Sequence, residues 1–231
     1  MLYQASRLEA ITENLANANV PGYKRSVSST KPFIGAFQSA LYNEMPEAGV
    51  IQNQSVTDFT TGPTRQTERP LDFAIEGNGF FVVRRGTQEF YTRSGAFALD
   101  ETGTLITNGG LKVGRNDITL APETNLENLT VDPDGTLRDG RNVVGQIDMV
   151  KFASPSKLDR VGPGMFTAPS GMTAESVDSS AKMYNRMLEQ SNASVISEMV
   201  EMVDCMRSYE ACQKMVTLQD GVEGTIISKL G

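Results

Sequence analysis

The sequence predicts an α+β protein, with N- and C-terminal helices packed as a coiled-coil-like pair and a small all-β domain inserted between them. Apolar residues recur at spacings of three and four near both ends of the chain, which is typical of helices with one apolar stripe. The middle consists of short β-prone runs separated by Gly, Asn and Asp. Because a striped helix needs a partner to cover it, the two ends are expected to pack against each other and against neighbouring molecules.

Residues 1–22 are expected to form an N-terminal core helix and its stop, with the helix itself over 1–19. Pro21 disfavours a helical conformation in the residue before it, and Gly22 permits a backbone conformation closed to other residues. The apolar stripe of this helix consists of Leu8, Ile11, Leu15 and Ala18.

Residues 23–70 form an extended arm or linker in this interpretation, because they are rich in Ser, Thr, Gln, Gly and Pro and show little periodicity. Aromatic residues spaced along this segment favour an arm that docks on a surface. A short helix over residues 33–42 is one alternative for part of it.

Residues 71–175 are predicted to form the β domain. The sequence from Glu76 to Gly79 is a hairpin signal between two β-prone runs. The segments 99–105 and 131–137 resemble each other, and each is predicted to form strand, tight turn and strand. Calcium binding by the second turn, at Asp132, Asp134 and Gly135, is disfavoured because the remaining ligands of a calcium loop are missing.

Residues 176–231 are assigned to a C-terminal core helix region, with a long helix over 191–220. Its apolar stripe consists of Val195, Met199, Met202, Met206, Tyr209 and Val216. Cys205 and Cys212 lie about 10 Å apart along such a helix, which is too far for a disulfide bond between them. Both are interpreted as helix packing residues, with an intermolecular or redox role as the alternative.

Composition argues against an enzyme and against several classes of partner. The chain has no His, which removes the commonest general base and metal ligand, and no catalytic or nucleotide-binding motif is present, so no cofactor, metal or small-molecule substrate is expected. A net charge of −7 disfavours binding to nucleic acid. The longest apolar runs are too short to span a membrane, and the first residues do not resemble a cleavable signal peptide.

Three motifs, in this order, resemble the signatures of bacterial flagellar rod and hook proteins. The first runs from Asn14-Leu15-Ala16-Asn17 to Pro21-Gly22-Tyr23-Lys24, and the second covers 70–83 and 91–97. The third comprises Glu198-Met199-Val200-Glu201-Met202-Val203 and Arg207-Ser208-Tyr209-Glu210. Within this family, the small β domain and the run 58–72 favour a proximal rod protein, with a distal rod protein as the alternative.

The resemblance implies a structural subunit of the flagellar basal-body rod. Family members are exported by the flagellar type III apparatus without a cleaved signal peptide, and they assemble in the periplasm with copies of themselves and with other rod proteins. Their terminal helices form the inner tube of a torque-transmitting shaft. The stripe residues are therefore expected to form the assembly interface. A stand-alone coiled-coil oligomer with a β head is the alternative from another class.

Overall fold

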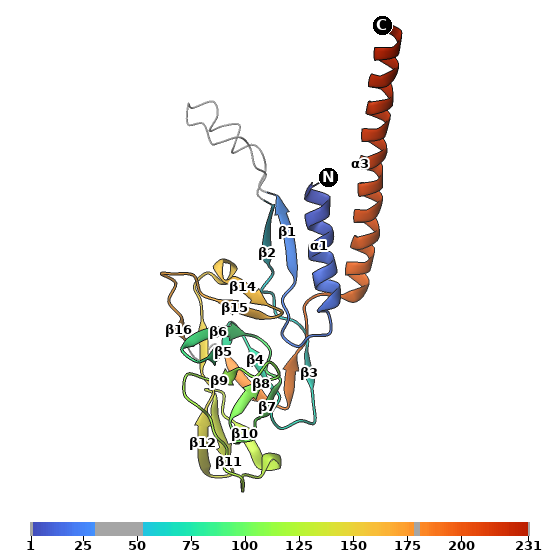
Figure 1. Ribbon diagram of the computed structural model, residues 1–231. Helices are drawn as coiled ribbons and strands as arrows, with labels where there is room; N and C mark the ends of the chain where they lie inside the picture. Colours follow the sequence, from blue (N-terminus) through green and yellow to red (C-terminus); the bar gives the residue numbers. More distant parts are fainter. Residues whose placement is uncertain (1, 31–52, 178–180, 231) are drawn as a thin grey trace. The chain divides into compact units, whose positions relative to one another are not determined.

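The computed structural model describes residues 2–30, 53–177 and 181–230 and divides the chain into two compact units. One unit, here called the helical unit, comprises 1–16, 26–57 and 194–231, and the other, the β body, comprises 17–25 and 58–193. Neither unit is a single stretch of sequence, because the chain enters each of them more than once (Figure 1).

The described part of the helical unit contains two helices and a strand pair. α1 covers Leu2–Ala16 and α3 covers Val195–Leu230. β1 (Ser26–Thr30) and β2 (Asn53–Thr57) form an antiparallel pair beside α1 (Figure 1). α1 ends earlier than the sequence predicts, because the chain turns after Ala16 and the Val20 amide bonds the Asn17 carbonyl at 3.0 Å. The short helix at 33–42, given above as one alternative, lies outside the described residues.

The β body is built from short antiparallel strands in several sheets. Its largest sheet has the order β14-β15-β6-β5-β9-β8-β7, with β13 joining β5 to β16. A second sheet has the order β10-β11-β12, and two further pairs join β17 to β4 and β18 to β3. The bounds are β3 Thr64–Gln66, β4 Phe73–Glu76, β5 Phe80–Arg85, β6 Gln88–Thr92, β7 Phe97–Leu99, β8 Leu105–Thr107, β9 Lys112–Val113, β10 Leu129–Val131, β11 Thr136–Asp139, β12 Asn142–Gln146, β13 Met149–Lys151, β14 Asp159–Gly162, β15 Met165–Thr167, β16 Glu175–Ser176, β17 Lys182–Asn185 and β18 Met187–Glu189, with short 3-10 helices at Leu126–Asn128 and Pro155–Lys157.

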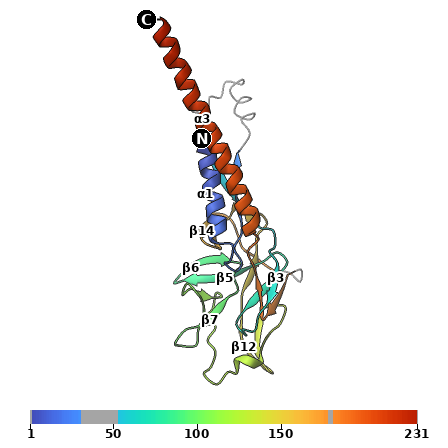
Figure 2. The ribbon, with the colours of Figure 1, turned by 90° about the vertical axis from the view of Figure 1, so that its right-hand side faces the viewer.

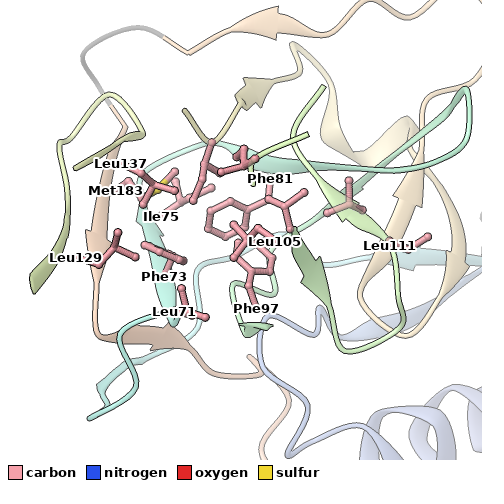
Figure 3. Close-up of a cluster of buried hydrophobic side chains, with 14 of the residues drawn as sticks. Leu71, Phe73, Ile75, Phe81, Phe97, Leu105, Leu111, Leu129, Leu137 and Met183 are labelled. Carbon is pink, nitrogen blue, oxygen red and sulfur yellow. The ribbon is translucent and has the colours of Figure 1, made fainter. Parts of the chain in front are cut away.

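The main core of the β body gathers apolar side chains from strands that are distant in the sequence. Phe81 meets Phe97 edge-to-face with ring centroids 5.2 Å apart, and Phe73 lies 5.9 Å from Phe97 (Figure 3). Leu137 and Met183 are buried in the same cluster. Burial of such side chains stabilises the body by roughly 1.5–3 kcal/mol each, before the loss of chain entropy is counted.

The predicted fold class is wrong in its proportions. The described chain is mostly β, with a large multi-sheet region and one helix at each end, and not a small β domain inserted between coiled-coil helices. Strands before residue 71 and after residue 175 were missed because their partners are remote. β3 pairs with β18, and β4 pairs with β17, so no local pattern reveals either pair.

The hairpin predicted at Glu76–Gly79 is also wrong. β4 and β5 flank this turn, yet β4 pairs with β17, while β5 pairs with β6, β9 and β13. Gly77 has a φ of +96°, and its carbonyl accepts a 2.7 Å hydrogen bond from Arg93 Nη2. The turn therefore moves the chain from one sheet to another.

The two similar segments at 99–105 and 131–137 do form similar turns. The amides of Gly103 and Gly135 donate to the carbonyls of Asp100 and Asp132 at 3.0 and 2.9 Å. Both glycines have positive φ, +78° and +90°. The predicted turn chemistry is confirmed at both places.

Candidate assembly site

α1 and α3 lie against each other within the helical unit (Figure 1, Figure 2). Near the start of α1, the Cys205 thiol donates to the Gln4 carbonyl at 3.4 Å. Arg7 and Glu201 approach to 3.7 Å, but both side chains are about one-third exposed, so this ion pair contributes little. Ile11 is almost fully buried on α1. The face of α3 that carries Cys205 is thus the face turned toward α1.

Asn14 connects three elements of the helical unit. Its side-chain oxygen accepts from the Ser26 amide at 2.7 Å, and its side-chain nitrogen donates to the Ser26 carbonyl at 2.8 Å. The same nitrogen donates to Glu198 Oε2 at 3.2 Å. Glu198 is fully buried in the first turn of α3, where a carboxylate without hydrogen bonds would be costly. The first residue of the N-terminal motif therefore contacts the first residue of the C-terminal motif.

The structure places the predicted stripe residues in several different environments. On α1, Ile11 is buried while Leu8 and Leu15 are half-buried, and Ala18 lies in the turn after the helix. On α3, the half-buried residues are Val195 and Met202, and the exposed ones are Met199, Met206 and Tyr209. Val216 lies in α3, but its side chain is outside the described residues. Their role in assembly remains a prediction.

The remaining motif residues are also divided between the two units. Arg207 and Glu210 are exposed on α3, and Ala16 is exposed at the end of α1. Asn17 is half-buried, whereas Gly22 and Tyr23 are buried in the β body. The N-terminal motif thus contributes to both units.

A row of exposed apolar side chains follows the first turns of α3. Side chains three and four positions apart lie on one side of a helix. We call this row the α3 stripe, and it consists of Ile196, Met199, Val200, Val203 and Met206, whose exposed fractions are 77%, 51%, 58%, 48% and 48%. Exposed apolar surface of this extent on one helix face is typical of a surface that binds another protein.

Gly22 sits where the chain packs tightly inside the β body. Its amide donates to the Glu189 carbonyl at 2.8 Å, and its φ is +69°. A Cβ at this position would lie 2.3 Å from the backbone carbon of Arg93, so only Gly fits. Tyr23, the next residue, is fully buried and has the Arg160 guanidinium 5.0 Å from its ring centroid.

The β body encloses a cluster of three charged side chains beside this glycine. Lys24 Nζ donates to Glu189 Oε1 at 2.6 Å and to the Thr60 carbonyl at 2.7 Å. Arg93 Nη1 donates to Glu189 Oε2 at 3.5 Å, and the Gly62 amide donates to Glu189 Oε1 at 2.9 Å. The side chains of Lys24 and Glu189 are 0% exposed and that of Arg93 is 3% exposed. One buried carboxylate therefore compensates two buried cations.

Burial shifts the pKa of both cations in this cluster in the same direction. Loss of water lowers the pKa of Lys24 below its usual value, and the charge of Glu189 opposes part of this change. Burial likewise lowers the pKa of Arg93, again opposed by Glu189. Glu189 therefore compensates the charge of both cations inside the body.

Lys24 and Arg93 lie within the family motifs, but sequence reasoning gave neither of them a role, and Glu189 and Asn192 lie outside those motifs. The Asn192 side chain accepts from the Arg25 amide at 2.7 Å and donates to the Asp58 carbonyl at 2.9 Å. A charged residue within a β-prone run was the available signal at Arg93. Nothing local indicated that these residues would meet, because they lie far apart in the chain.

Nothing in the described part of the chain offers a metal centre, since no three His, Cys, Asp or Glu side chains are grouped there in a way that would hold an ion. Within the same residues, no helix combines the length and apolar character needed to cross a membrane. Cys205 and Cys212 are both free thiols, the first buried and the second half-buried.

Three flagellar family models match the chain in order. The model described as "Flagella basal body rod protein" matches residues 2–24, and "Flagellar hook protein FlgE/F/G D1 domain" matches 74–138. The model described as "Flagellar basal body rod FlgEFG protein C-terminal" matches 184–229. The two ends and the body thus have the same arrangement as this class of flagellar proteins.

Full-length relatives make the assignment more specific. The chain is 30% identical to the flagellar basal-body rod protein FlgG of Bacillus subtilis, covering 94% of this chain and 90% of the relative. It is also 30% identical to the rod protein FlgF of Caulobacter vibrioides, with coverage of 97% and 91%. FlgG of Borreliella burgdorferi is 28% identical, with coverage of 97% and 93%. The chain belongs to the flagellar basal-body rod protein family.

Proposed function

We propose that this protein is a structural subunit of the bacterial flagellar basal-body rod and polymerises through its terminal helices into the torque-transmitting shaft. Membership of the rod family supports the structural role. The α3 stripe is the observation that carries the polymerisation step, because an uncovered apolar helix face is stabilised when another molecule covers it. A stand-alone coiled-coil oligomer is not favoured, since rod proteins match nearly the whole chain.

The finer parts of this proposal concern partners, location and interface. The partners are copies of the chain, other rod proteins and the flagellar type III export apparatus, and the location is the periplasmic rod, reached without a cleaved signal peptide. The interface includes the half-buried and exposed stripe residues of both helices. A proximal rod protein, FlgF, is proposed over a distal one because of the run 58–72, although relatives with both names are equally identical.

The experiment replaces an exposed apolar residue on α3 with a charged one. Met206→Asp is expected to abolish or strongly reduce incorporation into basal bodies and swimming, because assembly would bury an unpaired carboxylate. Val143→Asp is the matched control, since Val143 is 61% exposed on β12 of the other unit. Normal assembly of the Met206 variant would contradict polymerisation through α3, and absence of the unaltered chain from purified basal bodies would contradict the rod assignment.

A further inference from the structure

The helical unit has an apolar groove in addition to the α3 stripe. The groove has a volume of about 680 Å³ and is lined mainly by Ala5, Leu8, Glu9 and Glu13 of α1 and by Cys205 and Tyr209 of α3. Leu8 and Ala5 provide apolar surface on one wall, and the two glutamates give that wall an acidic character. The groove is therefore suited to an apolar helix that also carries positive charge.

The groove and the α3 stripe lie on opposite sides of α3. Cys205 lines the groove and bonds α1, whereas Val203 belongs to the stripe and is 48% exposed. Two residues that are two positions apart on a helix of 3.6 residues per turn point in roughly opposite directions. A single molecule consequently cannot place its own stripe in its own groove.

Positively charged side chains continue the α3 stripe along the helix, and they complement the acidic groove. Arg207 follows Val203 by four positions and Lys214 follows Arg207 by seven, so both cations extend the same side of α3, and both are exposed. Glu210 lies between them on this side, which leaves two cations to one anion. The side of α3 that carries the stripe is thus apolar as far as Met206 and mainly basic beyond it.

We propose that the α3 stripe of one copy docks in the groove between α1 and α3 of a second copy; this inference rests on the proposed rod function and deepens it. Apolar complementarity supplies most of the attraction, and Arg207 facing Glu9 selects the orientation. Because two different surfaces meet, each added copy leaves one stripe and one groove open. Such a heterologous contact extends into a helical array unless its rotation closes a ring.

Disulfide cross-linking in purified basal bodies tests this pairing. In a background where Cys205→Ser and Cys212→Ser remove the native thiols, the double variant Ala5→Cys and Val203→Cys is expected to give a ladder of dimers and larger species on oxidation, and each single variant is expected to give no ladder. Ala5 and Val203 are both exposed, and circular dichroism verifies that each variant folds. In this double-cysteine background, Glu9→Lys and Arg207→Glu are each expected to lower the ladder yield severalfold, and their combination to restore it.

Each other outcome overturns a defined part of the proposal. Cross-linking of either single variant to itself would show an isologous contact instead. Cross-links only to a different protein would show that a second copy is not the occupant. A chain that enters basal bodies but forms no ladder would refute the groove pairing and leave the rod function intact, whereas a parent chain absent from basal bodies would refute both.

Discussion

The side-chain amide of Asn14 donates a hydrogen bond to the carboxylate of Glu198 across 3.2 Å, joining residues 184 positions apart in the chain. Asn14 lies in the last turn of α1 and Glu198 in the first turn of α3. Asn14 also makes two hydrogen bonds to the backbone of Ser26. This one buried side chain therefore bonds both Glu198 and Ser26. The contact between the helices is therefore partly polar at its buried end.

Asn14→Ala is expected to destabilise the helical unit by about 1–3 kcal/mol, because the buried amide and carbonyl of Ser26 lose their partner. Hydrogen exchange at the Ser26 amide measures the effect and should become faster. Asn19→Ala, at an exposed position after the helix, is the control. Equal exchange rates in the two variants would show that the Asn14 bonds do not stabilise this unit.

Glu189→Gln is expected to destabilise the β body by about 3–5 kcal/mol, because Lys24 and Arg93 would remain buried without their counter-charge. Urea unfolding followed by circular dichroism measures the change in the free energy of unfolding. Glu175→Gln, at an exposed carboxylate on β16 of the same unit, should leave the midpoint unchanged. If both variants unfold at the same urea concentration, the buried cluster has no such role.

Gly22→Ala is expected to destabilise the β body more than Gly140→Ala. Both glycines have positive φ, +69° and +61°, so both substitutions carry a backbone cost of about 1–2 kcal/mol. Only Gly22 adds a clash, since its Cβ would lie 2.3 Å from the Arg93 backbone, while nothing lies within 4 Å of a Cβ at Gly140. Thermal unfolding compares the variants, and equal midpoints would argue against the tight packing at Gly22.

Asp100→Asn is expected to weaken the acid sensitivity of the β body. Hydrogen bonds from the Thr102 hydroxyl and the Thr104 amide hold the pKa of Asp100 below its usual value of 3.8. A lowered carboxyl pKa gives stability that is present above the usual value and lost as the pH falls through the lowered one. The difference in unfolding free energy between parent and variant should therefore shrink between pH 7 and strongly acidic pH.

Urea unfolding at a series of pH values measures this difference. Asp159→Asn, at an exposed carboxylate on β14, is the matched control. A pH dependence altered equally by both substitutions would show that the hydrogen bonds in the Asp100 turn are not its source.

Local sequence patterns predicted well only those features that depend on neighbouring residues. The turns at Gly103 and Gly135 were predictable because an Asp and a Gly at short spacing define them. The pairing of β4 with β17 was not, because a strand pattern shows which residues are apolar but not which strand will lie beside them. The same gap led to the wrong hairpin between β4 and β5.

The candidate site likewise has some features that local sequence patterns predict and others that depend on distant residues. Spacing identified two terminal helices with apolar residues, and the motifs identified the flagellar family, so these properties were determined by the sequence alone. Only the tertiary structure decided that α3 turns Glu198 and Cys205 toward α1 and leaves Val203 and Met206 exposed. It also decided that Lys24, Arg93 and Glu189 meet in one buried cluster. The physical reason is that periodicity marks the faces of a helix or strand, whereas the partner that covers each face is set by packing between residues far apart in the chain.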